Sequence, residues 1–178
     1  TGAITLSTAN GALSGSAADL VLAFDGTVTT HTGTVTVSDT HNLAQLKAIN
    51  NASTGQITLN DYTVALSGSA ADVSAALAGS FAANYTGTAT ISDAPSVAEL
   101  KTINEGTTGA ITLSTADGAL SGSAADLVLA LAGTITTHTG TVTISDAPTV
   151  AQLKAINGAT TGAITLSTAN GALSGSAA

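Results

Sequence analysis

The sequence predicts an α/β protein built as an open right-handed solenoid of strand–helix coils, with a stacked parallel sheet on one side and short helices on the other. Tandem repetition, short strand patterns and capped helical patterns that follow them support this prediction. Strand–helix–strand connections within one sheet are right-handed in nearly all proteins. A closed barrel of eight such units needs roughly 250 residues, and the 178-residue pattern shows no sign of closure.

The repeat is 53 or 54 residues long, because the motif TGxITL begins at Thr1, Thr54, Thr108 and Thr161. These positions divide the chain into repeat 1 (1–53), repeat 2 (54–107), repeat 3 (108–160) and a truncated repeat 4 (161–178). Residues 161–178 are identical to residues 1–18. We therefore expect one continuous solenoid without independent domains, seen as a window on a longer periodic sequence.

Two strands are predicted in each repeat, in segments such as AITLS and TVTIS. Apolar side chains alternate with polar ones there, at Ile111 and Leu113 and again at Val142 and Ile144. That alternation is typical of a strand with one buried face. Threonine and isoleucine also favour strands, because β-branched side chains fit a pleated surface.

A helix is predicted after each strand. In SGSAADLVLALAG, Ser123 and Asp126 have capping-box spacing, and Leu127 and Leu131 share one face before Gly133 ends the helix. In SDAPTVAQLKAIN the corresponding pair is Thr149 and Gln152, with Asp146 as an alternative cap. The other repeats carry Ser96/Glu99 and Asn42/Gln45 at these places.

Composition excludes several classes of function. The chain is 44% hydrophobic but only 2% aromatic, so any core is built from small, regular layers. Its net charge is −8 and its cations are three lysines, whereas nucleic acids and anionic membranes are bound by basic side chains. No apolar run approaches the ~20 residues that span a bilayer, so we expect no membrane insertion. There is no cysteine, which fits an extracellular protein stabilised by repetition.

Two sets of equivalent aspartates recur in all three repeats, Asp39/Asp93/Asp146 and Asp19/Asp72/Asp126, which argues against a single catalytic pair. Each has a structural role available at a helix start, so we expect capping. A Ca²⁺ site at the equivalent residues Asp39, Asp93 and Asp146 is the alternative, although no EF-hand or GGxGxD motif is present.

The remaining polar residues give no catalytic or cofactor-binding prediction. His31, His41 and His138 have no metal-ligand spacing, and we expect them in exposed loops. The glycines form no phosphate-binding motif and are interpreted as turn residues that tolerate positive φ. We therefore expect no enzymatic activity and no cofactor.

Threonines occupy the polar side of the predicted strands and form the possible contact face, namely Thr34, Thr36, Thr88, Thr90, Thr141 and Thr143. A parallel stack would align these side chains in ladders. The face is interpreted as an ordinary polar surface, as a contact with a partner or sister chain, or as a lattice of the kind that several ice-binding solenoids use.

Residues 142–166 (VTISDAPTVAQLKAINGATTGAITL) and 120–133 (LSGSAADLVLALAG) resemble tandem repeats of very large bacterial cell-surface proteins, known from marine cyanobacteria and green sulfur bacteria. The resemblance extends repeat by repeat over essentially the whole chain. Repeat 2 departs most, at residues 60–68 and 80–87. The resemblance implies an extracellular structural or adhesive stalk and brings no catalytic residues.

We therefore expect a non-enzymatic structural segment of a long extracellular stalk, sheath or filament protein. Its partners are then further repeats of the same chain or sister copies, which leaves homopolymeric assembly open. The alternative is a binding module whose Thr-rich face contacts ice or a surface glycan. A carbohydrate-active enzyme would need a unique acidic cluster that breaks the repeat, and the sequence contains none.

Overall fold

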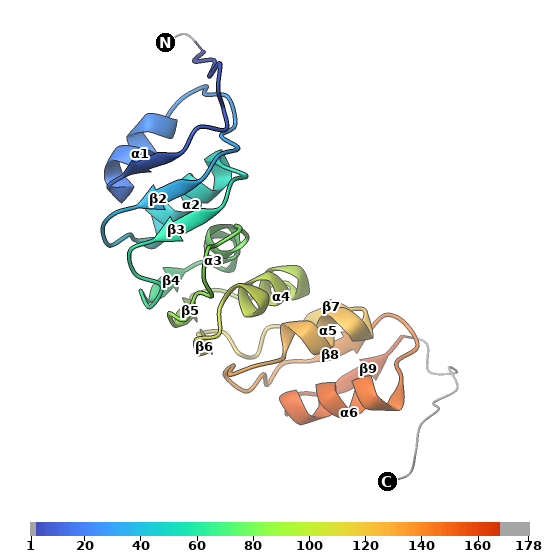
Figure 1. Ribbon diagram of the computed structural model, residues 1–178. Coiled ribbons are helices and arrows are strands. Elements are labelled where there is room, and N and C mark those ends of the chain that lie inside the picture. The colour runs from blue at the N-terminus through green and yellow to red at the C-terminus, as the bar shows by residue number, and fades with distance from the viewer. Residues whose placement is uncertain (1–2, 168–178) are drawn as a thin grey trace.

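The computed structural model describes residues 3–167. Within them the chain is an α/β structure with three parallel three-stranded sheets and six helices (Figure 1). The strands are β1 Leu13–Gly15, β2 Val35–Val37, β3 Ile57–Leu59, β4 Leu66–Gly68, β5 Ala89–Ile91, β6 Ile111–Leu113, β7 Leu120–Gly122, β8 Val142–Ile144 and β9 Ile164–Leu166. The helices are α1 Ala17–Phe24, α2 Leu43–Ala52, α3 Ala70–Leu77, α4 Val97–Gly106, α5 Ala124–Ala130 and α6 Val150–Ala159.

The LSG segments form strands that the sequence analysis missed. They are β1, β4 and β7, and each pairs in parallel with the strand that follows its helix. Three residues are too few for an alternating pattern, and the adjacent serine marks the helix start more strongly. The ITL segment of repeat 1 forms only a single bridge, from Ile4 to Val28. The part of repeat 4 after residue 167 lies outside the described residues.

Parallel pairing is confirmed, but the strands form separate sheets, β1-β2-β3, β4-β5-β6 and β7-β8-β9, instead of one continuous stack. Each helix begins 26 or 27 residues after the previous one, whereas paired strands are only 22 or 23 residues apart. Along one sheet, the number of residues between a strand and the helix that follows it therefore increases from strand to strand. The first turn of α2 comes to lie against β4, with Leu43 next to Gly68, so β4 begins a new sheet.

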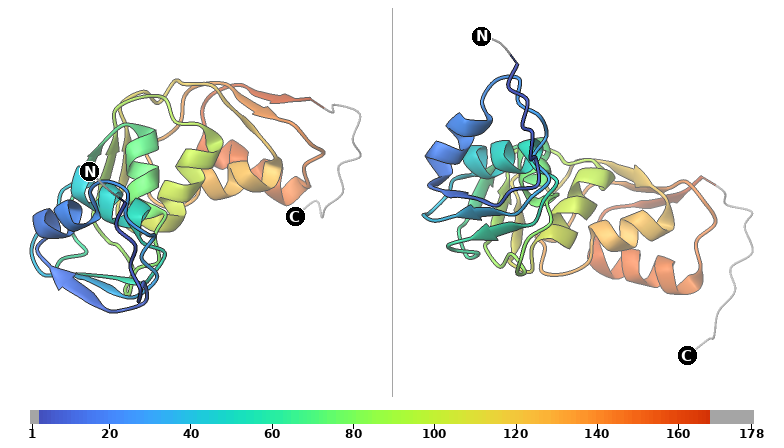
Figure 2. Two further views of the ribbon diagram at one scale, coloured as in Figure 1. Left: turned by 90° about the horizontal axis from the view of Figure 1, so that it is seen from above. Right: turned by 45° about the horizontal axis from the view of Figure 1, so that its top comes forward.

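The helices form one row in which each contacts the next, as Figure 2 shows. In Figure 1 they lie behind the first sheet and in front of the third, so the layers turn along the molecule. Apolar side chains between the two layers form the core, with Leu46 and Ile49 of α2 and Leu100 and Ile103 of α4 fully buried. No helix among residues 3–167 is long and apolar enough to cross a membrane.

The predicted helix starts are confirmed. Asn42/Gln45, Ser96/Glu99 and Thr149/Gln152 each form both hydrogen bonds of a capping box at α2, α4 and α6. Ser16, Ser69 and Ser123 are the N-caps of α1, α3 and α5. α5 ends at Ala130, earlier than predicted, with Leu131 as its C-cap, and Gly133 follows with a positive φ of 75°.

Candidate functional site

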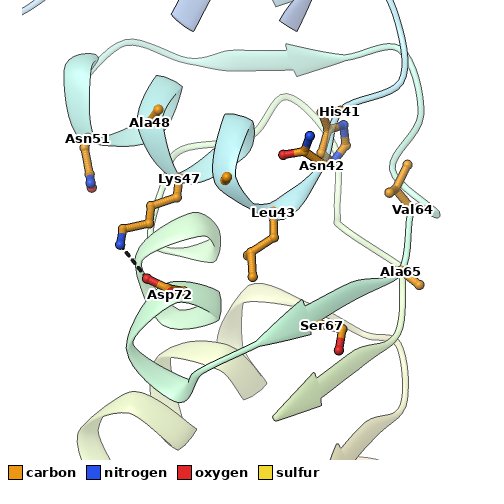
Figure 3. A pocket seen from close by; sticks show the side chains of 11 residues that line it. His41, Asn42, Leu43, Lys47, Ala48, Asn51, Val64, Ala65, Ser67 and Asp72 are labelled. Atoms are coloured by element: carbon orange, nitrogen blue, oxygen red, sulfur yellow. Dashed lines mark hydrogen bonds and ion pairs between the residues drawn. The ribbon is translucent and has the colours of Figure 1, made fainter. Parts of the chain in front are cut away.

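A groove of about 900 Å³ lies at the junction between repeats 1 and 2. It lies where the first turns of α2 meet β4 and α3 (Figure 3). Leu43 and Val64 give it apolar walls, and Lys47 and Asp72 lie together on one side. In the described chain β4 is the edge strand of its sheet, and the first turn of α2 lies against it.

The same groove recurs at the junction between repeats 2 and 3, with a volume of about 630 Å³. Val97, Lys101 and Asp126 line it and are the repeat equivalents of Leu43, Lys47 and Asp72. The groove therefore belongs to the repeat geometry and is not a focal site of one repeat.

Polar contacts tie neighbouring repeats together beside each groove. The Nζ atom of Lys47 forms an ion pair with Asp72, and Asn50 Nδ2 donates to the carbonyl of Ala75 at 2.7 Å. At the next junction, Lys101 pairs with Asp126 at 2.8 Å, and Asn104 Nδ2 donates to the carbonyl of Leu129 at 2.8 Å. These contacts join the last helix of one repeat to the first helix of the next.

The ion pairs change the acidity of their members. Hydrogen bonds from Lys47 and then Ser69 lower the pKa of Asp72, and those from Lys101 and Ser123 lower the pKa of Asp126. The hydrogen bond to Asp126 raises the pKa of Lys101. The Asp72 and Asp126 carboxylates therefore stay ionised at neutral pH, and each ion pair stabilises its junction, although partial exposure limits what it contributes.

The three aspartates considered as calcium ligands each accept a hydrogen bond at the start of a different helix. Asp39 Oδ1 accepts a hydrogen bond from the Ala17 amide at 2.7 Å, Asp93 from Ala70 at 2.7 Å and Asp146 from Ala124 at 2.8 Å. Each carboxylate thus caps a helix, as expected, but the helix belongs to the preceding strand–helix unit. Among residues 3–167, no three His, Cys, Asp or Glu side chains are grouped closely enough to hold a metal ion.

The threonines of the possible contact face form short rows on separate sheets. Thr36, Thr90 and Thr143 are each central in a three-strand row, and the rows are Ser14–Thr36–Thr58, Ser67–Thr90–Thr112 and Ser121–Thr143–Thr165. Thr34, Thr88 and Thr141 lie just before the same central strands and are exposed. Because the sheets are interrupted, no row extends over more than three strands of the described chain.

The prediction that the histidines lie in exposed loops is wrong. His31, His41 and His138 are only 1%, 3% and 2% exposed. His31 and His138 occupy the slot that Tyr85 fills in repeat 2, and each of the three residues bridges to the next turn of the chain. The sequence signal that could have predicted their burial is the recurrence of an aromatic ring at this position in all three repeats. His41 replaces the buried prolines Pro95 and Pro148.

The buried rings have different hydrogen-bond partners. His138 has a partner on both nitrogens, with Nε2 2.7 Å from the Gly118 carbonyl and Nδ1 3.2 Å from Thr160 Oγ1. His31 packs on Phe24, with ring centroids 6.0 Å apart, and its two buried nitrogens have no partner among the described residues. The His41 ring has a partner for Nε2 only, the Tyr85 hydroxyl at 3.2 Å.

The grooves and the polar contacts beside them recur at the junctions between repeats. The candidate residues that the sequence indicates are likewise distributed along the chain. Among them, Asp39, Asp93 and Asp146 cap helices, and the histidines are buried. Comparison with protein-family models, with curated proteins and with solved structures finds no match to this chain.

Proposed function

We propose that this chain is a structural segment of a long, open, right-handed solenoid, without enzymatic activity. The observation that carries the proposal is the repeated junction. The Lys47–Asp72 pair with the Asn50 bond and the Lys101–Asp126 pair with the Asn104 bond are the same contacts one repeat apart. Each repeat therefore contacts the next repeat in the same way. A series of repeats joined by identical contacts can be extended indefinitely.

The proposed setting is a stalk, sheath or filament at the cell surface or outside the cell. Three features of the chain support it: the acidic surface with few lysines, the absence of cysteine and the resemblance of residues 120–133 and 142–166 to bacterial surface repeats. The partners are further repeats of the same chain or sister copies, joined at the apolar faces that end an open solenoid.

Electron microscopy of the native material tests this function. A stalk or filament protein gives thin threads of constant width, with an axial repeat set by the stacked units. Compact particles of a few nanometres, with no thread in any preparation, would contradict the proposal.

The second candidate function is binding of ice or a surface glycan through the Thr rows. The pairing of Thr36 with Thr58 in register favours it, because neighbouring strands lie about 4.8 Å apart. Thermal hysteresis that Thr36→Lys and Thr143→Lys abolish would support ice binding. Its absence in the unaltered chain would remove that part of the idea, and a glycan-array screen would decide the other.

A further inference from the structure

His41 lies at the junction between repeats 1 and 2, immediately before the N-cap Asn42. Its ring is 3% exposed, and its Nε2 atom lies 3.2 Å from the hydroxyl oxygen of Tyr85. Tyr85 in turn donates its hydroxyl proton to the carbonyl of Val64 at 2.6 Å. Since Tyr85 and Val64 both belong to repeat 2, this chain of hydrogen bonds joins the two repeats.

The hydrogen bonds assign the proton on the His41 ring. A tyrosine hydroxyl has one proton, and that of Tyr85 is used by Val64, so the Tyr85 oxygen accepts from an Nε2–H group of His41. The neutral ring therefore carries no proton on Nδ1, which is buried and has no hydrogen-bond partner among the described residues. A second proton would create a buried charge and a donor without an acceptor, which is costly.

The charged groups around His41 come from two loops. Asp39, in the loop between β2 and α2, and Asp61, between β3 and β4, both raise its pKa. Burial has the larger effect and lowers the pKa of His41 below its ordinary value of 6.5. The rings of Tyr85 and Phe81 complete the aromatic cluster and are uncharged.

The junction between repeats 2 and 3 differs at both positions. Pro95 replaces His41 there, and His138 replaces Tyr85. The Pro95 side chain cannot be protonated, and both ring nitrogens of His138 have hydrogen-bond partners, Thr160 Oγ1 and the Gly118 carbonyl. The two junctions therefore respond differently to acid.

We propose that the junction between repeats 1 and 2 is an acid-sensitive joint: protonation of His41 places an unpaired charge on its buried Nδ1 and so favours loosening of repeat 1 from repeat 2, while the junction between repeats 2 and 3 stays closed. This inference does not depend on the proposed stalk function, because it concerns two junctions within one chain.

The direction with pH follows from the proton balance. In the open junction, His41 binds a proton near its ordinary pKa of 6.5. In the closed junction its pKa is lower, so it binds the proton only at lower pH. The contribution of His41 to the closed state is therefore complete above about pH 6.5 and decreases as the pH falls below it. Asp61, Asp72 and Asp126 all have pKa values below their ordinary 3.8, so they stay ionised in this window.

Hydrogen exchange on the full chain at pH 7.5 and pH 5, corrected for intrinsic exchange rates, tests the joint. We expect the protection of amides near residues 41–46 and 62–68 to fall about tenfold at the lower pH. A change of this size is what the shifted pKa of a single group can produce. Protection near residues 95–100 and 118–122 should not change. Equal loss at both junctions, or no loss at either, would overturn the proposal.

Two substitutions assign the effect to His41. His41→Gln keeps a side-chain donor for Tyr85 but does not titrate, and His41→Pro introduces the residue that repeats 2 and 3 carry. Both should abolish the acid response of the first junction, and His138→Gln should leave that response intact. An undiminished response in His41→Gln would overturn the assignment even if His41→Pro did not fold.

Discussion

At the scale of single residues, the glycines of the Thr–Gly pairs allow successive turns of the chain to touch. A Cβ atom on Gly55 would overlap the carbonyl oxygen of Gly33, and one on Gly109 would overlap that of Gly87. Positive φ occurs at only two described glycines, Gly26 and Gly133. The described Thr–Gly glycines lie at bends, as predicted for turn residues, but none has a positive φ. A glycine is needed there because the backbones of successive turns approach closely.

Gly55→Ala should destabilise the chain by about 1–3 kcal/mol, the usual cost of forcing a methyl group into packed structure. Gly158→Ala in α6 is the matched control, since its methyl group would meet nothing within 4 Å. In a helix the same change is neutral or stabilises by up to about 1 kcal/mol. Urea unfolding followed by circular dichroism measures both, and equal effects of the two substitutions would contradict the stacking argument.

The buried histidines show how far sequence reasoning reaches at this scale. Exposure was expected because His31 and His138 lie in segments of Thr and Gly without an apolar period. Their burial depends on the next turn of the chain, where Ser53 and Thr160 close over them. That contact links residues 22 positions apart and is absent from any local pattern.

At the scale of elements, the helices were predictable and the sheets only in part. Ser123 with Asp126 and Thr149 with Gln152 mark helix starts by contacts three residues apart, which sequence displays directly. The division into three sheets follows from the mismatch between helix spacing and strand register. Strand register is a tertiary property, set by which residue of one turn lies beside which residue of the next.

The junction helices give a direct test of the polar ties. Asn50→Ala removes the hydrogen bond from α2 to the Ala75 carbonyl of α3 and should cost about 1 kcal/mol. Asn51→Ala in the same helix, where the side chain is exposed, should change stability by less than about 0.5 kcal/mol. Thermal unfolding of both variants measures the difference, and indistinguishable melting temperatures would show that the Asn50 bond does not hold the junction.

At the scale of the whole molecule, the two layers advance by different amounts. Packed helices lie about 8–10 Å apart, whereas paired strands lie about 4.8 Å apart. One continuous sheet spanning all six strand–helix units would therefore be shorter than the row of helices, unless the molecule were strongly bent. Starting a new sheet in each repeat relieves this difference, and the chain extends with its described ends far apart (Figure 1).

If the units continue in one direction without limit, a longer chain is simply a longer solenoid, and the sequence offers a seamless way to test this. Because residues 161–178 repeat residues 1–18, a chain in which residues 1–160 precede the complete sequence preserves the pattern across the join. Small-angle X-ray scattering of the single and the doubled chain measures how size grows with length. For an open solenoid we expect an unchanged cross-section and a radius of gyration that approaches about twofold that of the single chain. An increase of only about 1.3-fold, as for a compact globule of twice the length, would contradict it.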